Sequence, residues 1–305
     1  MFSDTHFHFK LAAQEYGINF VDVLTKMAQK DCFFALDIGT KAYDLYERMD
    51  FCEKTLLKIT DLNVLKKVCN FLYFSAGIWP DLDSVYDAEN QIKILKQNIL
   101  TCNSENSVFD SKNKDEFVLH KKVIAVGEGG LDHHWNSCGA DGRCSSDFNQ
   151  KTYDCEKNLF EMQLELAKEL NLPFIIHSRD AFEETLSCLK NIGYHNGIVH
   201  CFSYGIQEAR AFLDLGWYIA FGGGITYTKK SKILQMQELL NFIPEDRFLC
   251  ETDSPYLSPV PLRGTPNSPA NINYVYDFIA KSKGISAENF SAVVDKNIKN
   301  LFKIG

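Results

Sequence analysis

The chain opens with Met1-Phe-Ser-Asp-Thr-His-Phe-His8, in which two histidines are separated by one residue. Side chains of a β-strand alternate between its two faces, so His6 and His8 share a face of an extended segment, together with Asp4. A strand of this kind delivers two imidazoles to one point, as a metal site requires. The alternative is a histidine pair at an exposed strand end. This short stretch alone leaves both interpretations open.

Beyond this stretch, short apolar runs alternate with amphipathic segments along the chain, which indicates buried strands alternating with helices. The further predicted strands are residues 32–37, 71–78, 122–128, 172–177, 197–200, 217–221 and 247–253. The predicted helices are residues 18–30, 41–69 in two pieces, 84–100, 156–170, 181–191, 206–215 and 230–241, with extra helices at 268–283 and 287–302. Eight strands in this alternation predict an α/β fold with a single domain, a (β/α)8 TIM barrel over residues 1–305 with extra C-terminal helices.

Two polar stretches interrupt the alternation. Residues 101–115 are predicted as a loop, and residues 136–149 as an insertion that follows the fourth strand. Because the insertion follows the carboxyl end of a strand, we expect it on the face of the barrel where the strands end.

Six potential metal ligands lie at the carboxyl ends of the predicted strands. They are His6, His8, Glu128, His177, His200 and Asp253. A rim charge, a satisfied core imidazole or a turn residue would explain any one of them alone. In a parallel barrel, however, all carboxyl ends of the strands open on one face, so these six side chains converge.

Six such side chains exceed the four ligands of a tetrahedral zinc site. They suit two divalent ions bridged by a carboxylate, an arrangement used for in-line displacement at phosphoesters and for other metal-assisted hydrolysis. Histidine-rich sites favour Zn²⁺ while phosphoester hydrolysis often uses Mg²⁺ or Mn²⁺, so the identity of the ions stays open.

Five segments resemble the signature blocks of the TatD-family deoxyribonucleases, which belong to the metal-dependent amidohydrolase superfamily. They are Asp4-Thr-His-Phe-His8, Val126-Gly-Glu-Gly-Gly-Leu-Asp132, Phe174-Ile-Ile-His-Ser-Arg-Asp-Ala181, Val199-His-Cys-Phe-Ser203 and Glu251-Thr-Asp-Ser-Pro-Tyr-Leu257. The later segment Arg263-Gly-Thr-Pro-Asn-Ser-Pro269 is similar to the family's loop after the last strand. The segments keep the family's order, so the resemblance covers nearly the whole chain.

The resemblance implies a role for each ligand. One divalent ion would be held by His6, His8 and Asp253, a second by His177 and His200, and Glu128 would bridge the two. As catalytic residues the resemblance implies Glu128 and Asp253, and Asp253 would take the proton of the attacking water.

Substrate contacts are expected at the rim of the barrel. Arg179 is placed to meet a phosphate, although an ion pair with Asp180 is an equal alternative. The family usually has Gly-x-His-Pro after the third strand where this chain has Gly77-Ile-Trp-Pro80, and Trp79 would either stack on a base or cover the rim. His133 and His134, at the base of the insertion, are expected to be exposed polar residues, with contact to the substrate as the alternative.

Bulk properties narrow the function class. The net charge of −8 argues against a general electrostatic grip on nucleic acid, but it permits local phosphate binding through cations. The chain has no apolar run near the ~18 residues that span a bilayer and no signal-peptide pattern, so we expect a cytoplasmic protein without membrane contact, or a nuclear one in a eukaryote. The ten cysteines contain no Cys-x-x-Cys pair, which favours free thiols over a metal site or bridge at Cys138, Cys144 and Cys155.

The sequence therefore predicts a monomeric, divalent-metal-dependent deoxyribonuclease that hydrolyses phosphodiester bonds of DNA as a 3′-5′ exonuclease. One alternative is a metal-dependent amidohydrolase or esterase acting on a small non-nucleic substrate. Another is a barrel that has lost catalysis and serves as a binding module.

Overall fold

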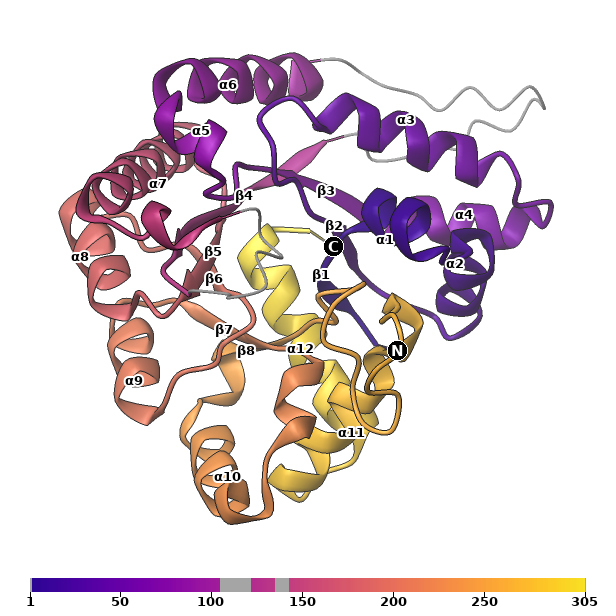
Figure 1. Cartoon of the computed structure of the whole chain (residues 1–305). Coiled ribbons are helices and arrows are strands. Elements are labelled where there is room, and N and C mark those ends of the chain that lie inside the picture. Colours follow the sequence, from indigo (N-terminus) through magenta and orange to yellow (C-terminus); the bar gives the residue numbers. More distant parts are fainter. Residues whose placement is uncertain (1, 105–121, 135–142, 305) are drawn as a thin grey trace.

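The structure, a computed structural model, describes residues 2–104, 122–134 and 143–304. Eight parallel strands follow one another around a single sheet in the order of the sequence, with helices outside them (Figure 1). The strands are β1 (Asp4–Phe7), β2 (Ala35–Asp37), β3 (Leu72–Ala76), β4 (Val123–Asp132), β5 (Phe174–Arg179), β6 (Gly197–Val199), β7 (Tyr218–Phe221) and β8 (Phe248–Cys250). A parallel bridge between Phe7 and Ser254 joins β1 to the chain just beyond β8. The predicted (β/α)8 barrel is confirmed.

Twelve α-helices occur in the described residues. They are α1 (Phe9–Tyr16), α2 (Phe20–Gln29), α3 (Leu45–Leu56), α4 (Leu62–Phe71), α5 (Leu82–Tyr86), α6 (Ala88–Ser104), α7 (Gln150–Leu170), α8 (Phe182–Ile192), α9 (Ile206–Asp214), α10 (Ile233–Phe242), α11 (Ile272–Lys283) and α12 (Ala287–Phe302). Local chemistry sets several helix ends: the Asp61 carboxylate accepts backbone N–H groups at the start of α4, and Gly193 ends α8 in the left-handed conformation. Within the described ranges, none of these helices has both the length and the apolar character to cross a membrane.

The helices differ from the prediction in four places. The single helix predicted at residues 84–100 is two helices, α5 and α6. The short helix α1 was not predicted, because it buries only Phe9 and Ala12 and so carries little periodic signal. Residues 101–104 of the predicted loop belong to α6, and the rest of that loop lies outside the described residues. Helix α7 begins at Gln150, earlier than predicted, because the side chain of Asn149 accepts the N–H of Thr152 and caps it.

Two strands that carry predicted ligands contain a β-bulge. Asp4–Phe7 of β1 pairs with Ala35–Asp37 of β2, so β1 advances three residues while β2 advances two. The same mismatch occurs where Val126–Gly129 of β4 pairs with Phe174–Ile176 of β5. A bulge bends its strand and redirects side chains. The bulge in β4 contains Glu128.

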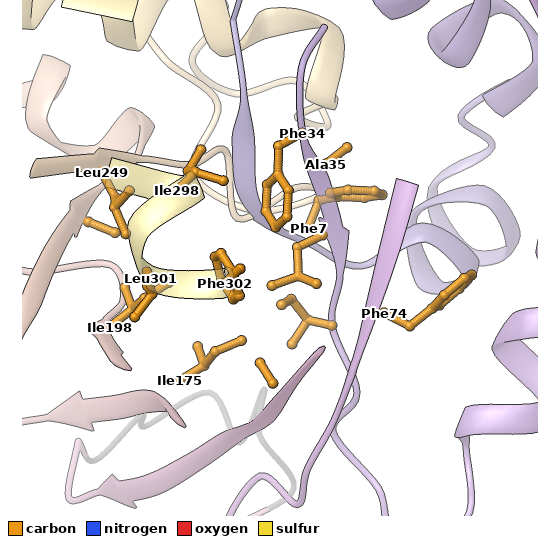
Figure 2. Close-up of a cluster of buried hydrophobic side chains, with 14 of the residues drawn as sticks. Phe7, Phe34, Ala35, Phe74, Ile175, Ile198, Leu249, Ile298, Leu301 and Phe302 are labelled. Carbon is orange, nitrogen blue, oxygen red and sulfur yellow. The ribbon is translucent and has the colours of Figure 1, made fainter. Parts of the chain in front are cut away.

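Helix α12 crosses the end of the barrel at which the strands begin (Figure 1). The ring of Phe302 stacks 4.9 Å from that of Phe34, which directly precedes β2, and the side-chain amide of Asn297 donates to the carbonyl of Phe248 at 2.9 Å. Figure 2 shows apolar side chains of α12 and of the strands gathered there, including Ile298, Leu301, Phe302, Ile175, Ile198 and Leu249. Apolar packing therefore closes this end, and polar chemistry is left to the opposite end.

Candidate metal centre

The opening stretch places His6 and His8 at the carboxyl end of β1. His6 is fully buried in the strand, and His8 follows the last strand residue. Their ring centroids are 5.2 Å apart. Two backbone hydrogen bonds hold them against the chain beyond β8, from the N–H of His8 to the carbonyl of Ser254 (2.8 Å) and from the N–H of Asp253 to the carbonyl of His6 (2.9 Å). The two imidazoles thus enter the same volume, as the pattern predicts.

Glu128 lies between two pairs of histidines and is buried. Its Oε2 atom is 3.1 Å from Nε2 of His6 and 3.8 Å from Nε2 of His8. Its Oε1 atom is 2.8 Å from Nδ1 of His177 and 3.1 Å from Nε2 of His200. Each carboxylate oxygen therefore faces one pair, which is the disposition required of a carboxylate that bridges two ions.

The second pair of histidines is His177 and His200. A further carboxylate lies close to each of these rings, on the nitrogen that does not face Glu128. Nε2 of His177 is 3.0 Å from Oδ2 of Asp132, and Nδ1 of His200 is 3.4 Å from Oε1 of Glu251. One nitrogen of each ring thus faces Glu128, and the other faces the second carboxylate. Such a partner orients an imidazole and selects the nitrogen offered to a metal.

Asp253 lies beside the first pair of histidines. Its Oδ1 atom is 3.5 Å from Nε2 of His8 and 3.7 Å from Nε2 of His6. The strand β8 ends at Cys250, so Asp253 follows the strand instead of ending it as predicted. Its φ angle of +54° lies in the left-handed region, which aspartate tolerates better than most residues.

Asp4 anchors the segment that carries Asp253. Its carboxylate accepts the hydroxyl of Thr252 at 2.6 Å and the backbone N–H of Thr252 at 2.9 Å. From the other side, the amide of Asn267 donates to the carbonyl of Thr252 at 2.9 Å. Asp4 and Asn267, both fully buried, therefore fix the chain just before Asp253.

The glycines around Glu128 allow β4 and β5 to approach closely. Gly130 has a φ angle of +148°, and a Cβ atom there would lie 1.9 Å from the carbonyl oxygen of His177. Gly127 has a φ angle of +123°, and its Cβ would lie 2.7 Å from the carbonyl oxygen of Ile175. The glycines in the run Val-Gly-Glu-Gly-Gly are therefore needed for β4 to pack closely against β5, and this close packing brings Glu128 beside His177.

Burial and neighbouring charges have opposite effects on the pKa values of the ionisable groups in this cluster. Burial opposes the ionised form of Glu128, yet the charge of His200 and hydrogen bonds with the surrounding imidazoles hold its pKa well below the usual range. Burial likewise opposes ionisation of Asp253, but the hydrogen bond with His8 and nearby imidazole charges lower its pKa. Burial disfavours protonated His177, but hydrogen bonds with carboxylates raise its pKa to about 9. At neutral pH and without a cation, both carboxylates are thus ionised and His177 is protonated.

The residues fit divalent cations. Among the described residues, three groups have ligand atoms that all lie within 4.8 Å of one another. Two of them share Glu128, and the groups are His6–His8–Glu128, Glu128–His177–His200 and His6–His200–Glu251. Imidazole nitrogens and carboxylate oxygens are ligands of Zn²⁺, and carboxylates also suit Mg²⁺ and Mn²⁺. Each of the two groups that share Glu128 could hold a divalent cation, and Asp253 belongs to none of the three groups.

The two predicted substrate contacts lie at the rim. Arg179, the last residue of β5, is exposed and forms no ion pair with any described residue. The alternative ion pair with Asp180 does not form, because Asp180 instead accepts from Nδ1 of His134 at 2.6 Å. Trp79 is half-buried, with its ring centroid 5.9 Å from that of His177 and the guanidinium of Arg143 5.5 Å from its face.

The prediction of an exposed side chain is wrong for His133. Its ring packs 4.0 Å from that of Tyr153, and its Nε2 atom is 3.5 Å from Glu156, so the start of α7 covers it. The side chain of His134 is 40% exposed, as predicted, and pairs with Asp180. Residues 136–142 of the predicted insertion lie outside the described residues.

The cysteines of the described residues are all free thiols, as predicted. Cys144 is exposed and Cys155 is half-buried, and in the described part of the chain neither joins a metal-capable group. Cys138 lies outside the described residues.

Sequence reasoning did not single out Asp132 and Glu251. Both lie inside the quoted segments, four residues after Glu128 and two residues before Asp253. The available signal is the general rule that a ligand histidine is backed by a carboxylate or a carbonyl. Which carboxylate backs which ring depends on contacts between strands, so this signal alone could not assign them.

Known proteins of the TatD family resemble this chain in sequence and in fold. Residues 3–303 match the family described as TatD related DNase. The chain is 30% identical over 306 residues to a Bacillus subtilis protein named uncharacterized metal-dependent hydrolase YabD, with 100% of both chains covered. It is 35% identical over 171 residues to the 3′-5′ ssDNA/RNA exonuclease TatD of Salmonella typhimurium, covering 53% of this chain and 65% of that protein. The fold resembles that of YJJV, a TatD homologue from Escherichia coli, with a TM-score of 0.75, 24% identity, and coverage of 100% of this chain and 98% of that one.

Proposed function

Because the chain belongs to the TatD-related DNase family of metal-dependent hydrolases, we propose that it is a divalent-metal-dependent deoxyribonuclease that shortens single strands from the 3′ end. The observation that carries the proposal is the carboxylate of Glu128, whose two oxygens face two different histidine pairs. The name of the Salmonella relative supports the direction of digestion and a single-stranded substrate.

The chain would hold two ions in the two halves of the cluster. The ligands of the first would be His6, His8 and Asp253, those of the second His177 and His200, and Glu128 would serve both. When bound, such ions polarise a phosphate and make water a stronger nucleophile. Asp132 and Glu251 would keep the imidazoles of the second half oriented.

Asp253 would take the proton of the attacking water. The water oxygen forms a bond to phosphorus, the bond from phosphorus to the 3′-oxygen of the remaining strand breaks, and that oxygen takes up a proton from solvent. The carboxylate suits this role because it is ionised at neutral pH and is 9% exposed at the open end of the barrel.

Two rim residues would position the strand. The exposed guanidinium of Arg179 lies two residues beyond His177 in β5 and would donate to a phosphate. The ring of Trp79 would stack on a base, supported by Arg143 behind it.

The test is hydrolysis of single-stranded DNA that carries a 5′ label, by protein loaded with Mg²⁺, Mn²⁺ or Zn²⁺ in turn. We expect a ladder of shortened labelled strands and release of 5′-mononucleotides, both lost in Asp253→Asn. An RNA strand of the same sequence, tested in parallel, measures the preference for the sugar.

Cleavage of small carboxylic or lactone esters by metal-loaded protein that leaves DNA and RNA intact would overturn the proposal. That result would favour the hydrolase of small substrates. Internal cleavage, or shortening from the 5′ end, would overturn the proposed direction and keep the nuclease.

A further inference from the structure

Two exposed tyrosines, Tyr256 and Tyr16, lie in succession between the imidazole of His8 and solvent. The ring centroid of Tyr256 lies 6.1 Å from that of His8 at an interplanar angle of 72°. The ring of Tyr16 lies 6.3 Å from that of Tyr256 at an angle of 79°. Tyr256 is 44% exposed and Tyr16 is 41% exposed. A line of aromatic rings therefore runs from a proposed metal ligand to solvent.

The backbone at Tyr256 is fixed by hydrogen bonds. Its N–H donates to the carbonyl of Asp253 at 2.9 Å, and the N–H of Asn267 donates to the carbonyl of Pro255 at 2.9 Å. The turn that carries Tyr256 is thus tied on both sides to the segment that positions Asp253. The point from which the ring projects is therefore fixed relative to the reacting centre, which reduces the ordering that ligand binding requires.

Aromatic rings flank the cluster from both halves. Trp79 lies edge-on to His177 in the second half, with 5.9 Å between the ring centroids, and Tyr256 lies edge-on to His8 in the first half. Glu128 contacts both of these histidines. A strand whose phosphate lies at Glu128 would therefore meet an aromatic ring on either side.

The charges near Tyr256 favour a base over a phosphate. Glu15, next to Tyr16 in the sequence, is exposed and would repel a phosphate. The whole chain carries a net charge of −8, so a broad electrostatic grip on the nucleic-acid backbone is weak. Stacking on aromatic rings supplies affinity that requires no positive charge and tolerates every base.

We propose that Tyr256, supported by Tyr16, forms a stacking subsite for a nucleobase of the single-stranded substrate, on the first half of the cluster and opposite Trp79. This inference rests on the proposed nuclease function and assigns its substrate contacts. The subsite takes one unpaired base without regard to its identity.

The experiment measures kcat and KM on single-stranded DNA in which each of the last few 3′ nucleotides is replaced in turn by an abasic nucleotide. We expect Tyr256→Ala to raise KM on the order of tenfold with little change in kcat, because stacking of this strength acts equally on bound substrate and transition state. Tyr256→Phe keeps the ring and should behave as the wild type. Tyr16→Ala should raise KM by a smaller factor.

The abasic series identifies the base concerned. At one position, loss of the base should raise the wild-type KM by about the same factor as Tyr256→Ala does, and the two changes together should raise it no further. Leu57→Ala, at an exposed apolar residue just beyond α3, is the control and should leave KM unchanged.

The possible failures are distinguishable. If the wild type cleaves DNA and folded Tyr256→Ala and Tyr16→Ala have unchanged KM, the stacking subsite is overturned and the nuclease stands. The same holds if no abasic position is coupled to Tyr256. If the wild type cleaves no strand at all, the proposed function itself fails, and the subsite fails with it.

Discussion

The two halves of the candidate metal centre contain the same kinds of potential ligand but are built differently. The half at β1 draws both imidazoles, His6 and His8, from one stretch of chain. The half at β5 and β6 draws His177 from β5 and His200 from the residue after β6, and each of these rings lies near a second carboxylate, Asp132 at 3.0 Å and Glu251 at 3.4 Å. Within the described residues, the buried Nδ1 atoms of His6 and His200 both lack a hydrogen-bond partner.

The rings also differ in proton affinity. In the first half, burial and the charge of His200 lower the pKa of His6, whereas against the effect of burial the carboxylates of Asp253 and Glu128 raise the pKa of His8. In the second half, against the same effect of burial, carboxylates raise the pKa of His177 to about 9 and that of His200 well above its usual value. The carboxylates around each ring, Glu128 among them, therefore decide how readily it exchanges a proton for a cation.

Removal of the shared carboxylate should have the largest effect, because it breaks both halves at once. We expect Glu128→Ala to lower kcat/KM by at least about 10³-fold and to weaken binding of both ions, since several kcal/mol of stabilisation is lost. Metal stoichiometry and hydrolysis of single-stranded DNA measure the two effects. Retention of two tightly bound ions would contradict the bridging role.

A change confined to the first half should separate chemistry from ion binding in the second. Asp253→Asn keeps the size of the side chain but cannot accept a proton from water, so we expect kcat to fall by about 10²–10⁴-fold. Binding of the ion between His177 and His200 should persist. Were kcat to stay within a few-fold of the wild type, another residue would have to be the base.

A change behind the second half tests the role of the outer carboxylates. Asp132→Ala removes the partner of His177 and should weaken one ion by about 10–100-fold while the other is unaffected. Isothermal titration with Mn²⁺ or Zn²⁺ resolves the two affinities. Asp180→Ala is the matched control, because Asp180 lies just beyond β5, the strand that carries His177, and pairs only with His134 among the described residues. Equal weakening of both ions by Asp132→Ala would contradict the assignment.

The smallest effect concerns pH. A cation entering the second half must displace the protons of His177 and His200, whose pKa values are both raised, so its affinity should rise with pH through about 9, the pKa of His177. In the first half the pKa of His6 is lowered, so only His8, whose pKa is raised, should release a proton. Titrations in buffers of different ionisation enthalpy count the protons released. A pH-independent affinity in the second half between about pH 6 and 9 would show that neither His177 nor His200 gives up a proton to the ion, and would contradict their role as ligands.

Much of the fold and of the site could be predicted because it rests on local patterns. The alternation of apolar runs and helical periods predicts the barrel, and parallel strands bring Glu128 and His177 to one face wherever the loops run. The helix α1 escaped prediction since only Phe9 and Ala12 of its residues are buried. The packing of His133 on Tyr153 escaped it since neither residue reveals its partner in the sequence.

The sequence by itself determined the kinds of potential ligand, their order and the end of the barrel at which they meet, because these follow from side-chain chemistry and strand direction. Only the tertiary structure decided which oxygen of Glu128 faces which imidazole, that Asp132 and Glu251 lie behind His177 and His200, and that Tyr256 reaches solvent beside His8. These features depend on one-residue bulges and on contacts between segments more than a hundred residues apart, such as Asp4 with Thr252. Short-range patterns carry no information about such distances, because register and side-chain direction are settled when the strands pack together.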